Sequence, residues 1–462
     1  MNDNILLDTD SYKITHWRQY PPGTTRVHSF LESRGGVHPT TLFFGLQYLL
    51  QRYFAGPVVT EAAIAEARET YAAHFGDASL FNERGWRHIL EAHGGRLPVE
   101  IRAVPEGTEV PVSNVLMTIE NTDTSVPWLT NYLESLLLQV WYPSTVATQS
   151  RYMRRTIESA LEKTGDPSLI AFKLHDFGLR GSTSLESAGL GGAAHLVSFS
   201  GTDTIPALAL ARRFYAEPMA GFSIPAAEHS TITSWGRDRE AAAYRNMLSS
   251  YPAGLVAVVS DSYDIFRACE ALWGRELKDA VLAREGTLVI RPDSGHPPDV
   301  VCRVLDILGE AFGATTNAKG YRVLDPHVRV IQGDGIDHAM LVSILGAMAE
   351  RGWSADNVAF GSGGALLQKV HRDTQKFAIK CSAVEVEGEW RAVMKDPVTD
   401  PGKRSKAGRL ALERTEQGYR TVAREAASHD LLEPVFRDGE VLRTQTFADV
   451  RARADGRTAL SD

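Results

Sequence analysis

The sequence predicts an α/β protein in which an irregular α/β barrel of about seven parallel strands interrupts a second, α+β domain. Two observations lead to this prediction. Between residues 170 and 365, strand-like runs alternate with stretches whose apolar residues recur at three-to-four spacing, as in helices. On both sides of this region, helical segments are mixed with short strands and show no such alternation. We therefore expect the second domain to be built from both chain ends.

The segments of the central region share one plan, in which an apolar run ends in small, polar or charged residues. They are AFKLHDFG (171–178), HLVSFSGTD (195–203), GFSIPAAEHS (221–230), LVAVVSDSYD (255–264), TLVIRPDSG (287–295), VRVIQGDG (328–335) and NVAFGSGG (357–364). Helix-compatible stretches such as DIFRACEALWGREL (264–277) and VVCRVLDILGEAF (300–312) follow most of them. Because strands alternating with helices form parallel sheets, we expect an α/β barrel over residues 151–380.

The flanking regions predict the second domain. TEAAIAEARETYAAHF (60–75) is typical of a helix, and strands are predicted at 24–33, 97–107 and 114–122. The C-terminal part carries AVEVEGEWRAVMKD, GYRTVARE and GEVLRTQTF, which are typical of antiparallel strands. We expect residues 1–150 and 381–462 to form one α+β domain.

Composition excludes several classes of protein. The 462 residues are 43% hydrophobic and 23% charged with a formal charge of -8, so nothing global indicates a nucleic-acid or anionic-membrane partner. The three cysteines form no CxxC pair, which favours a reducing compartment over a disulfide scaffold or zinc ribbon. The N-terminus is not typical of a signal peptide, and the most apolar window, 133–143, is too short to span a bilayer. We expect a cytoplasmic protein.

Unusual residues gather where the predicted barrel strands end, which is where barrel enzymes place their active sites. They are Asp176, Asp203, His229, Asp261, Arg291, Asp293, Asp334 and the glycines of GSGG. A single aspartate in such a place is often only a helix N-cap. That explanation is poor for the whole set, because several of these residues are followed by further polar residues and not by a helix start.

Two glycine-rich turns and one basic run predict phosphate binding. GSGG (361–364) leads from a strand into a helix-compatible run, so its backbone N–H groups suit a phosphate. IQGDG (331–335) flanks Asp334 with glycines, and that carboxylate or Asp293 suits ribose hydroxyls. The run KDPVTDPGKRSKAGRL (395–410) suits a polyphosphate, although a solvated loop is the alternative.

These residues belong to a longer series of motifs that resembles the nicotinate/nicotinamide phosphoribosyltransferase family in order and approximate spacing. The motifs are ILLDTDSYKITHWRQYPP, LFFGLQYLL, HDFGLRG, SGTDT, IPAAEHSTITSWG, VSDSYDI, IRPDSG, VIQGDG, FGSGGALLQK and KDPVTDPGKRSKAGRL. The resemblance covers essentially the whole chain. It implies a type II phosphoribosyltransferase fold, Mg2+ and ATP as cofactors, and a homodimer whose active sites lie at the subunit interface. The implied reaction joins nicotinamide to 5-phosphoribosyl-1-pyrophosphate (PRPP), giving nicotinamide mononucleotide and pyrophosphate.

The resemblance also implies roles for individual residues. Phe177 and, from the partner subunit, Tyr12 would sandwich the pyridine ring, while Asp203 would accept a hydrogen bond from the carboxamide. Other contacts to the base, ribose or substrate phosphate would come from Asp10, Arg180, Arg291, Asp293, Gly333 and Asp334. Contacts to the 5-phosphate or pyrophosphate would come from Arg34, Gly363, Gly364, Arg372, Lys380, Lys395 and Lys403, some of them across the interface. No metal held by protein side chains alone is expected.

The single histidine of PAAEHSTITSWG, His229, has three interpretations. A packed structural histidine is the default for an isolated residue. A metal ligand is disfavoured, because no second histidine follows at two, three or four positions. The resemblance implies the third, a histidine that ATP phosphorylates, with Asp261 orienting its ring.

Two alternative functions stay open at this stage. A nicotinate phosphoribosyltransferase would share the fold and the chemistry, but Asp203 argues against it because a carboxylate repels the nicotinate carboxylate. A non-catalytic binding protein on the same scaffold would not need the intact aspartates, glycines and lysines of the motifs.

Overall fold

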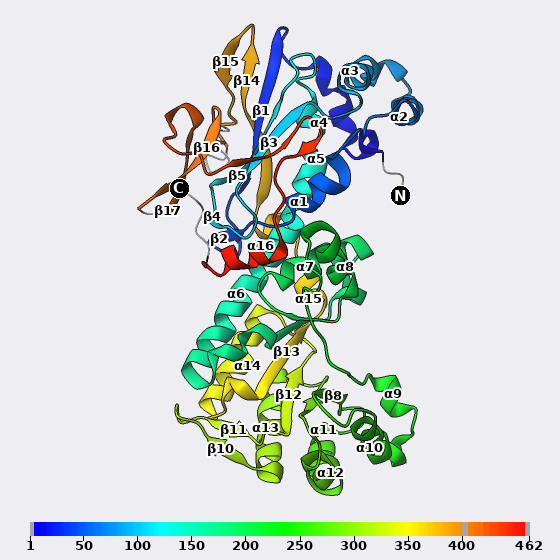
Figure 1. Cartoon of the computed structure of the whole chain (residues 1–462), viewed down its shortest axis with the longest axis vertical. Helices are drawn as coiled ribbons and strands as arrows, with labels where there is room; N and C mark the ends of the chain where they lie inside the picture. The colour runs from blue at the N-terminus through cyan, green and yellow to red at the C-terminus, as the bar shows by residue number, and fades with distance from the viewer. Residues whose placement is uncertain (1–3, 397, 400–404, 417, 458–462) are drawn as a thin grey trace. The chain divides into compact units, whose positions relative to one another are not determined.

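The computed structural model describes residues 4–396, 398–399, 405–416 and 418–457, and Figure 1 draws the whole chain. The chain divides into two compact units. We call Met1–Thr148, Arg213–Glu217 and His371–Asp462 the sheet unit, and Gln149–Arg212 and Pro218–Val370 the barrel unit. The first division falls inside the long helix α6 (Trp141–Thr164).

The barrel unit contains a parallel sheet, which confirms the predicted α/β class. Among the described residues the order of this sheet is β7-β6-β13-β12-β9-β8, and every neighbouring pair is parallel. The strands are β6 (Leu174–Asp176), β7 (Gly201–Thr202), β8 (Val256–Val259), β9 (Leu288–Arg291), β12 (Val328–Gln332) and β13 (Val358–Ser362). Most of their residues are buried, as expected of strands covered on both faces.

Helices follow the strands, as the alternating pattern predicts. They are α7 (Leu185–Leu196), α8 (Ile205–Tyr215), α9 (His229–Thr233), α10 (Glu240–Ser250), α11 (Ile265–Arg267), η9 (Ala268–Glu276), α12 (Lys278–Leu282), α13 (Pro297–Phe312), α14 (His338–Glu350) and α15 (Gly364–Leu367). The predicted strand at 195–203 is only partly observed. The side chain of Ser184 caps the start of α7, and this helix runs on through Leu196, so only Gly201 and Thr202 remain as strand.

The third of the seven predicted segments, 221–230, is not a continuous strand but still lies between the two edge strands. Phe222 forms a parallel bridge with Gly201 at the β7 edge, and Ala226 forms one with Ala257 of β8. Pro225 has no N–H to donate, which interrupts the ladder, although its carbonyl accepts from Ala257 N at 2.9 Å. Single bridges therefore link the two edges of the six-stranded sheet, in place of the predicted seventh strand.

The sheet unit confirms the α+β domain built from both chain ends. Its main sheet has the order β15-β14-β1-β5-β3-β18-β19, all antiparallel. The strands are β1 (Thr24–Ser33), β3 (Val99–Ala103), β5 (Val115–Asn121), β14 (Phe377–Val386), β15 (Glu389–Ala392), β18 (Glu433–Arg437) and β19 (Glu440–Val441). A domain boundary at residue 380, as predicted, would cut β14, which pairs with β1 along its length; the structure divides the chain after Val370 instead.

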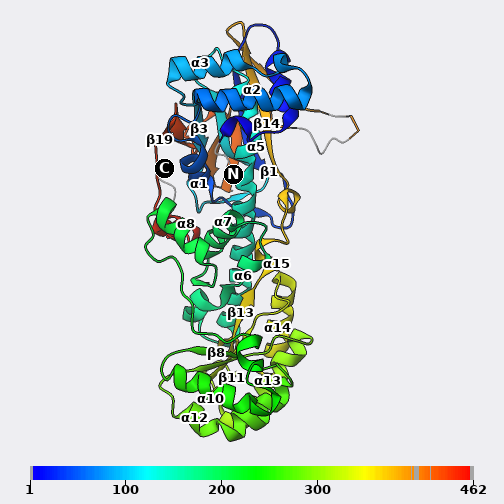
Figure 2. The same cartoon turned by 90° about the vertical axis from the view of Figure 1, so that its right-hand side faces the viewer.

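Helices and smaller sheets complete this unit. Figure 2 shows α2 (Glu61–Phe75) and α3 (Glu83–His93) side by side, and the predicted helix at 60–75 corresponds to α2. Further elements include α1 (Leu46–Leu49), α4 (Leu129–Tyr132), α5 (Glu134–Leu137), α16 (Phe447–Ala454) and the paired strands β2 (Thr40–Leu42) with β4 (Glu109–Pro111) and β16 (Leu410–Thr415) with β17 (Gly418–Ala423). In the described residues, no helix has the length and the apolar run needed to cross a bilayer.

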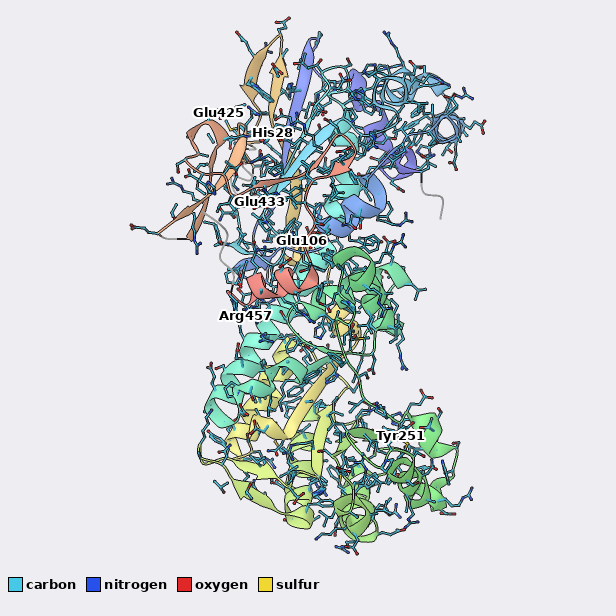
Figure 3. All side chains as sticks on the ribbon, in the orientation of Figure 1. His28, Glu106, Tyr251, Glu425, Glu433 and Arg457 are labelled. Carbon is cyan, nitrogen blue, oxygen red and sulfur yellow. The ribbon has the colours of Figure 1, made fainter. Side chains whose placement is uncertain are left out.

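A buried acid explains why residues 213–217 belong to the sheet unit. Glu106, labelled in Figure 3, accepts a hydrogen bond of 2.8 Å from the hydroxyl of Tyr215 and another from the backbone N–H of Gln47. Burial raises the pKa of Glu106 against the opposing effect of these hydrogen bonds. Tyr215 also stacks on Phe44 at 5.2 Å between ring centroids.

Candidate active site

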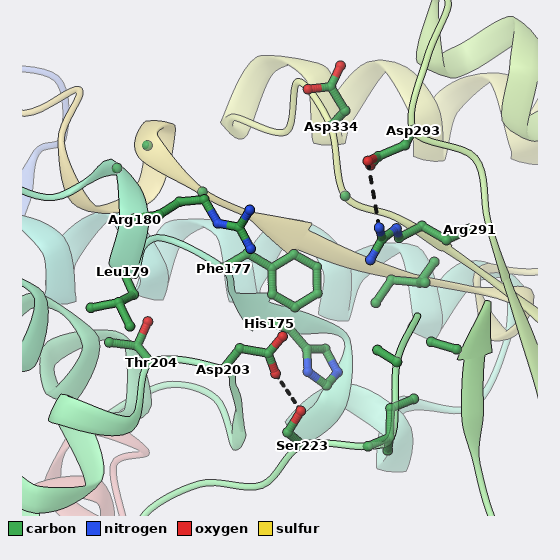
Figure 4. A pocket seen from close by; sticks show the side chains of 18 residues that line it. His175, Phe177, Leu179, Arg180, Asp203, Thr204, Ser223, Arg291, Asp293 and Asp334 are labelled. Atoms are coloured by element: carbon green, nitrogen blue, oxygen red, sulfur yellow. Dashed lines mark hydrogen bonds and ion pairs between the residues drawn. The ribbon is translucent and has the colours of Figure 1, made fainter. Parts of the chain in front are cut away.

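A cavity of about 450 Å³ lies where the parallel strands of the barrel unit end (Figure 4). Because the strands are parallel, residues that follow different strands in the sequence meet at one edge of the sheet. The cavity is lined by His175, Phe177, Leu179, Arg180, Gly181, Asp203, Thr204, Ser223, Ile224, Ala226, Ala257, Arg291, Asp293, Ile331, Gly333, Asp334, Gly363 and Gly364.

Phe177 forms an aromatic wall of this cavity. Its backbone N–H donates to Ser362 O at 2.9 Å, which fixes the residue beside the end of β13. Its ring lies so close to Gly361 that a Cβ at that position would stand 2.0 Å from Cε2 of the ring. A Cβ at Gly333 would reach the same ring atom at 3.4 Å. The ring can therefore occupy this position only because residue 361 has no side chain.

Asp176 holds the turn that carries Phe177. Its Oδ1 accepts from Gly178 N at 2.7 Å, and its backbone carbonyl accepts from Asp203 N at 2.9 Å. The side chain is fully buried, and Oδ2 has no hydrogen-bond partner among the described residues. Burial raises the pKa of Asp176 to about 6. The side chain of Asp176 thus holds the turn of the aromatic wall, and its backbone carbonyl holds the next carboxylate residue of the site.

Asp203 follows β7 directly and presents its carboxylate to the cavity, where Ser223 donates its hydroxyl hydrogen to Asp203 Oδ1 (Figure 4). Ser223 comes from the segment that bridges the edge strands, and it is a site residue that sequence reasoning missed. Its signal in the sequence is a single hydroxyl before the proline of FSIPAAEHS, which is too common a feature to identify a contact. Burial lowers the pKa of the neighbouring His175, with Asp203 opposing the effect.

Two arginines supply positive charge. Figure 4 shows the guanidinium groups of Arg180 and Arg291 on either side of the Phe177 ring in this view. Nη2 of Arg291 lies 3.8 Å from Oδ2 of Asp293. Nε of Arg291 is buried and has no hydrogen-bond partner among the described residues. A buried donor without a partner is unfavourable, so an anionic ligand that accepts from it would be stabilised.

His229 and several aspartates form a cluster of ionisable side chains at the same edge of the sheet. Nε2 of His229 donates to Oδ1 of Asp261 at 3.0 Å; the imidazole is 47% exposed, whereas the Asp261 carboxylate is 5% exposed. Burial raises the pKa of Asp293, and the nearby carboxylates of Asp261 and Asp334 add to this effect. Arg291 and His229 oppose it. These charged groups therefore influence one another electrostatically.

The glycine turn after β13 leaves the backbone accessible. Gly363 and Gly364 line the cavity, and a Cβ at Gly364 would meet nothing within 4 Å. Gly181 packs against this turn, since a Cβ there would lie 3.2 Å from Gly364 Cα. A phosphate can approach the N–H groups of such a turn without steric hindrance from a side chain.

The structure brings together only part of the predicted site. The predicted residues that line the cavity are Phe177, Arg180, Asp203, Arg291, Asp293, Gly333, Asp334, Gly363 and Gly364. His229 and Asp261 form their pair beside Asp293. Asp10, Tyr12, Arg34, Arg372, Lys380 and Lys395 belong to the sheet unit and do not line this cavity. Lys403 lies outside the described residues.

Within the sheet unit, these other predicted residues have local partners of their own. Tyr12 is 58% exposed in the 3₁₀ helix Ser11–Arg18, and the ammonium of Lys13 lies 5.4 Å from its ring centroid. Asp10 accepts from the hydroxyl of Ser135 at 2.5 Å. Nε of Arg34 lies 3.6 Å from a carboxylate oxygen of Glu32. An exposed aromatic side chain such as Tyr12 is available to a partner.

Comparison with known families now adds to this geometry. Residues 172–440 match the nicotinate phosphoribosyltransferase (NAPRTase) family, and residues 4–101 match the nicotinamide phosphoribosyltransferase N-terminal domain. The chain is 56% identical to a nicotinamide phosphoribosyltransferase of Xanthomonas campestris pv. campestris (strain 8004), with 98% of each chain covered. It is 33% identical to a protein of the same name from Acinetobacter baylyi, with 97% of each chain covered.

Solved structures share the fold at low sequence identity. The nicotinate-nucleotide pyrophosphorylase of Pyrococcus furiosus superposes with a TM-score of 0.61 at 16% identity, covering 99% of this chain and 96% of that one. Human nicotinic acid phosphoribosyltransferase superposes with a TM-score of 0.56 at 18% identity, covering 97% and 93%. At such identities the likeness concerns the fold alone, and it confirms the predicted type II architecture.

Proposed function

The chain belongs to the nicotinate phosphoribosyltransferase (NAPRTase) family, and we propose that it transfers the 5-phosphoribosyl group of PRPP to nicotinamide. The products are nicotinamide mononucleotide and pyrophosphate, in salvage of the nicotinamide ring for NAD. The observation that carries this choice of base is the Asp203 carboxylate in the cavity, near the Phe177 ring. Nicotinamide offers an N–H donor to this carboxylate, whereas nicotinate brings a second negative charge.

The aromatic and acidic walls orient the base. The pyridine ring stacks on Phe177, and its carboxamide NH2 donates to Asp203, whose other partner is the hydroxyl of Ser223. The pyridine nitrogen already carries a lone pair and no proton, so attack on C1 of the ribose needs no general base. Holding both reactants in line contributes several kcal/mol to lowering the barrier.

The arginines and the glycine turn act on the phosphorylated substrate. Asp334 lies at the cavity where vicinal ribose hydroxyls can donate to its carboxylate. The backbone N–H groups of the turn at Gly363 and Gly364 donate to the 5-phosphate. Arg180 and Arg291 place positive charge where the phosphates must lie, which stabilises pyrophosphate as it leaves with its bonding electrons.

Mg2+ fits this site through the substrate and not through a protein cage. In the described residues, no three carboxylate or imidazole ligand atoms at this edge lie within 4.8 Å of one another. Mg2+ commonly binds through one or two carboxylates together with substrate phosphates and waters. Asp293 and Asp261 are the carboxylates that would hold it or its waters. When bound, Mg2+ neutralises charge on the pyrophosphate.

We further propose that His229 couples the synthesis to ATP. Asp261 accepts a hydrogen bond from Nε2–H, so the proton stays on Nε2 and Nδ1 carries the free lone pair. Attack of Nδ1 on the γ-phosphorus forms an N–P bond and breaks the bond to the β–γ bridging oxygen, releasing ADP. Hydrolysis of the phosphohistidine then returns the imidazole and phosphate. The 47% exposure of the imidazole leaves room for the nucleotide.

The phosphohistidine has a direct test. Incubation with γ-labelled ATP and Mg2+ should place acid-labile, base-stable label on wild type, and 31P NMR should assign it to Nδ1. His229→Ala should carry no label while keeping some ATP-independent synthesis. Asp261→Asn should lower the labelling rate, because an amide oxygen orients the ring less strongly than a carboxylate. Label that survives in His229→Ala would sink the assignment.

We propose a homodimer with shared sites, because some of the predicted residues do not line the barrel cavity. Tyr12, Lys380 and Lys395 do not line that cavity, and we propose that a partner subunit supplies Tyr12 and some of these lysines. The three cysteines, Cys269, Cys302 and Cys381, are free thiols, which suits the reducing cytoplasm we propose as the location.

The experiment that tests the main proposal is synthesis of the mononucleotide by the purified chain. With PRPP, Mg2+ and nicotinamide, we expect stoichiometric nicotinamide mononucleotide and pyrophosphate. Arg291→Ala should reduce the rate strongly, because it removes a buried donor of the cavity. Turnover of nicotinate in preference to nicotinamide would favour the alternative enzyme. Binding of the substrates without turnover would favour a non-catalytic protein.

A further inference from the structure

Two histidines and one aspartate converge in the sheet unit, on residues that the reaction does not use. His88 and His93 lie on α3, and Asp123 lies two residues beyond the end of β5. Nε2 of each histidine is 2.7 Å from the same carboxylate oxygen, Oδ2 of Asp123. The imidazole centroids are 5.9 Å apart, with their planes at 75°. Two nitrogens and one oxygen therefore face a common point.

The three ligand atoms are spaced almost as they would be around one tetrahedral metal ion. They all lie within 4.8 Å of one another. A tetrahedral Zn2+ with bonds of about 2.0–2.1 Å holds its ligand atoms about 3.3 Å apart. Each N···O distance of 2.7 Å would have to open by only about 0.6 Å to admit the ion, a shift within reach of side-chain rotation.

The carboxylate is held as a ligating carboxylate usually is. Oδ1 of Asp123 accepts from Ser125 N at 2.7 Å, which leaves Oδ2 for the histidines. The side chain of Asn121 donates to Asp123 O at 2.8 Å and accepts from Val27 N at 2.8 Å, which ties the turn to β1. Such outer contacts fix the orientation of a metal ligand.

An ion can also reach the site from solvent. The side chains of His88, His93 and Asp123 are 39%, 28% and 16% exposed, so solvent can reach the site and supply a fourth ligand.

We propose that His88, His93 and Asp123 form a Zn2+ site that links α3 to the turn after β5. Two imidazoles and one carboxylate favour Zn2+ over Mg2+, which prefers oxygen ligands. Coordination through Nε2 requires each ring proton to reside on Nδ1, and the exposed rings can present that proton to water. Without metal, the same atoms form the hydrogen bonds described above.

The test uses the full chain after EDTA treatment and dialysis. Calorimetric titration with ZnCl2 in the presence of Mg2+ should give one site per protomer. His93→Gln should weaken this binding at least about 100-fold, and Asp123→Asn at least about 10-fold. The matched control is His327→Gln, which breaks a 2.7 Å pair between His327 and Asp325. No second histidine joins this pair in the part of the chain that the structure describes, so the Zn2+ affinity of this variant should equal that of wild type.

Two further measurements keep the result decisive if a variant folds poorly. Co2+ added to wild type should give the visible absorption of a tetrahedral site, and Zn2+ should abolish it. Zn2+ should also raise the Tm of wild type and of His327→Gln, but not that of His93→Gln. Absence of the Co2+ spectrum, or equal Zn2+ affinity in wild type and Asp123→Asn, would show that the three residues form only a hydrogen-bonded cluster.

Discussion

The barrel unit and the sheet unit carry their candidate functional residues in different ways. In the barrel unit, Phe177, Asp203, Arg291 and Asp334 each come at or just after the end of a parallel strand, so the topology alone gathers them around one cavity. In the sheet unit, neighbouring strands run in opposite directions, so the carboxyl ends of the strands do not meet at one edge of the sheet. The topology alone therefore does not gather residues such as Tyr12 around one site. A parallel sheet thus builds a site within one chain, whereas the antiparallel unit offers residues whose use we assign to a partner.

The largest expected effect comes from the tightest packing in the barrel cavity. Gly361→Ala places a methyl group 2.0 Å from the Phe177 ring, so the ring must leave its position. We expect kcat/KM to fall at least about 100-fold through the misplaced base and the unfolding free energy to fall by about 1–3 kcal/mol. Steady-state kinetics and denaturant unfolding measure the two effects.

The matched control is Gly346→Ala. Gly346 lies inside α14, where an added Cβ meets nothing within 4 Å, so alanine should raise helix stability by up to about 1 kcal/mol and leave kcat/KM unchanged. Equal loss of activity in both variants would mean that the Phe177–Gly361 contact does not position the base.

Subunit exchange tests whether Tyr12 of one chain contributes to the barrel cavity of its partner. Tyr12→Ala and Asp203→Ala homodimers should each be nearly inactive. After subunit exchange at equal concentrations, half of the dimers should be mixed and carry one intact site, restoring about a quarter of wild-type activity. If the mixture is no more active than either variant alone, Tyr12 acts within its own chain or not at all.

A smaller effect is expected from the buried acid that connects two walls of the cavity. Burial raises the pKa of Asp176 from 3.8 to about 6, so the folded state holds this proton more tightly than the unfolded state. The stabilisation is present below pH 4 and is lost as pH rises to about 6, at a cost of about 3 kcal/mol by pH 7.

Asp176→Asn should remove this pH dependence while its amide oxygen still accepts from Gly178 N. Unfolding free energies between pH 4 and pH 7 should therefore fall less steeply in Asp176→Asn than in wild type. Asp238→Asn, at an exposed position, should leave the wild-type slope unchanged. Equal slopes in all three proteins would contradict the raised pKa.

Much of the barrel unit could be predicted from the sequence, because its information is local. Apolar runs ending in polar residues located the strand ends, and their parallel arrangement placed Asp203, Asp293 and Asp334 at one cavity. The closure of the barrel was harder to predict. Segment 221–230 is reduced to single bridges at Pro225. The missing N–H of this proline is visible in the sequence, but the apolar pattern does not show which neighbouring strands the segment still bridges.

The residues that sequence reasoning missed depend on contacts between distant segments. Ser223 becomes a partner of Asp203 only because its segment lies beside β7. His88 and His93 are five positions apart, a spacing that zinc ligands can have, but Asp123 is far from both in the sequence and a histidine pair alone does not identify a site. Such sets become visible only when the fold has placed them together.

The measurement that tests the account most directly is the ratio of kcat/KM for nicotinamide to that for nicotinate. A charge-assisted hydrogen bond to Asp203 contributes about 1.5–3 kcal/mol, and repulsion of the nicotinate carboxylate adds to the difference. We therefore predict at least about 100-fold preference for nicotinamide in wild type. Asp203→Asn, and more strongly Asp203→Ser, should lose nicotinamide activity and gain nicotinate activity. A wild type that prefers nicotinate, or a ratio that does not change in the variants, would contradict the assignment of Asp203 as the residue that selects the base.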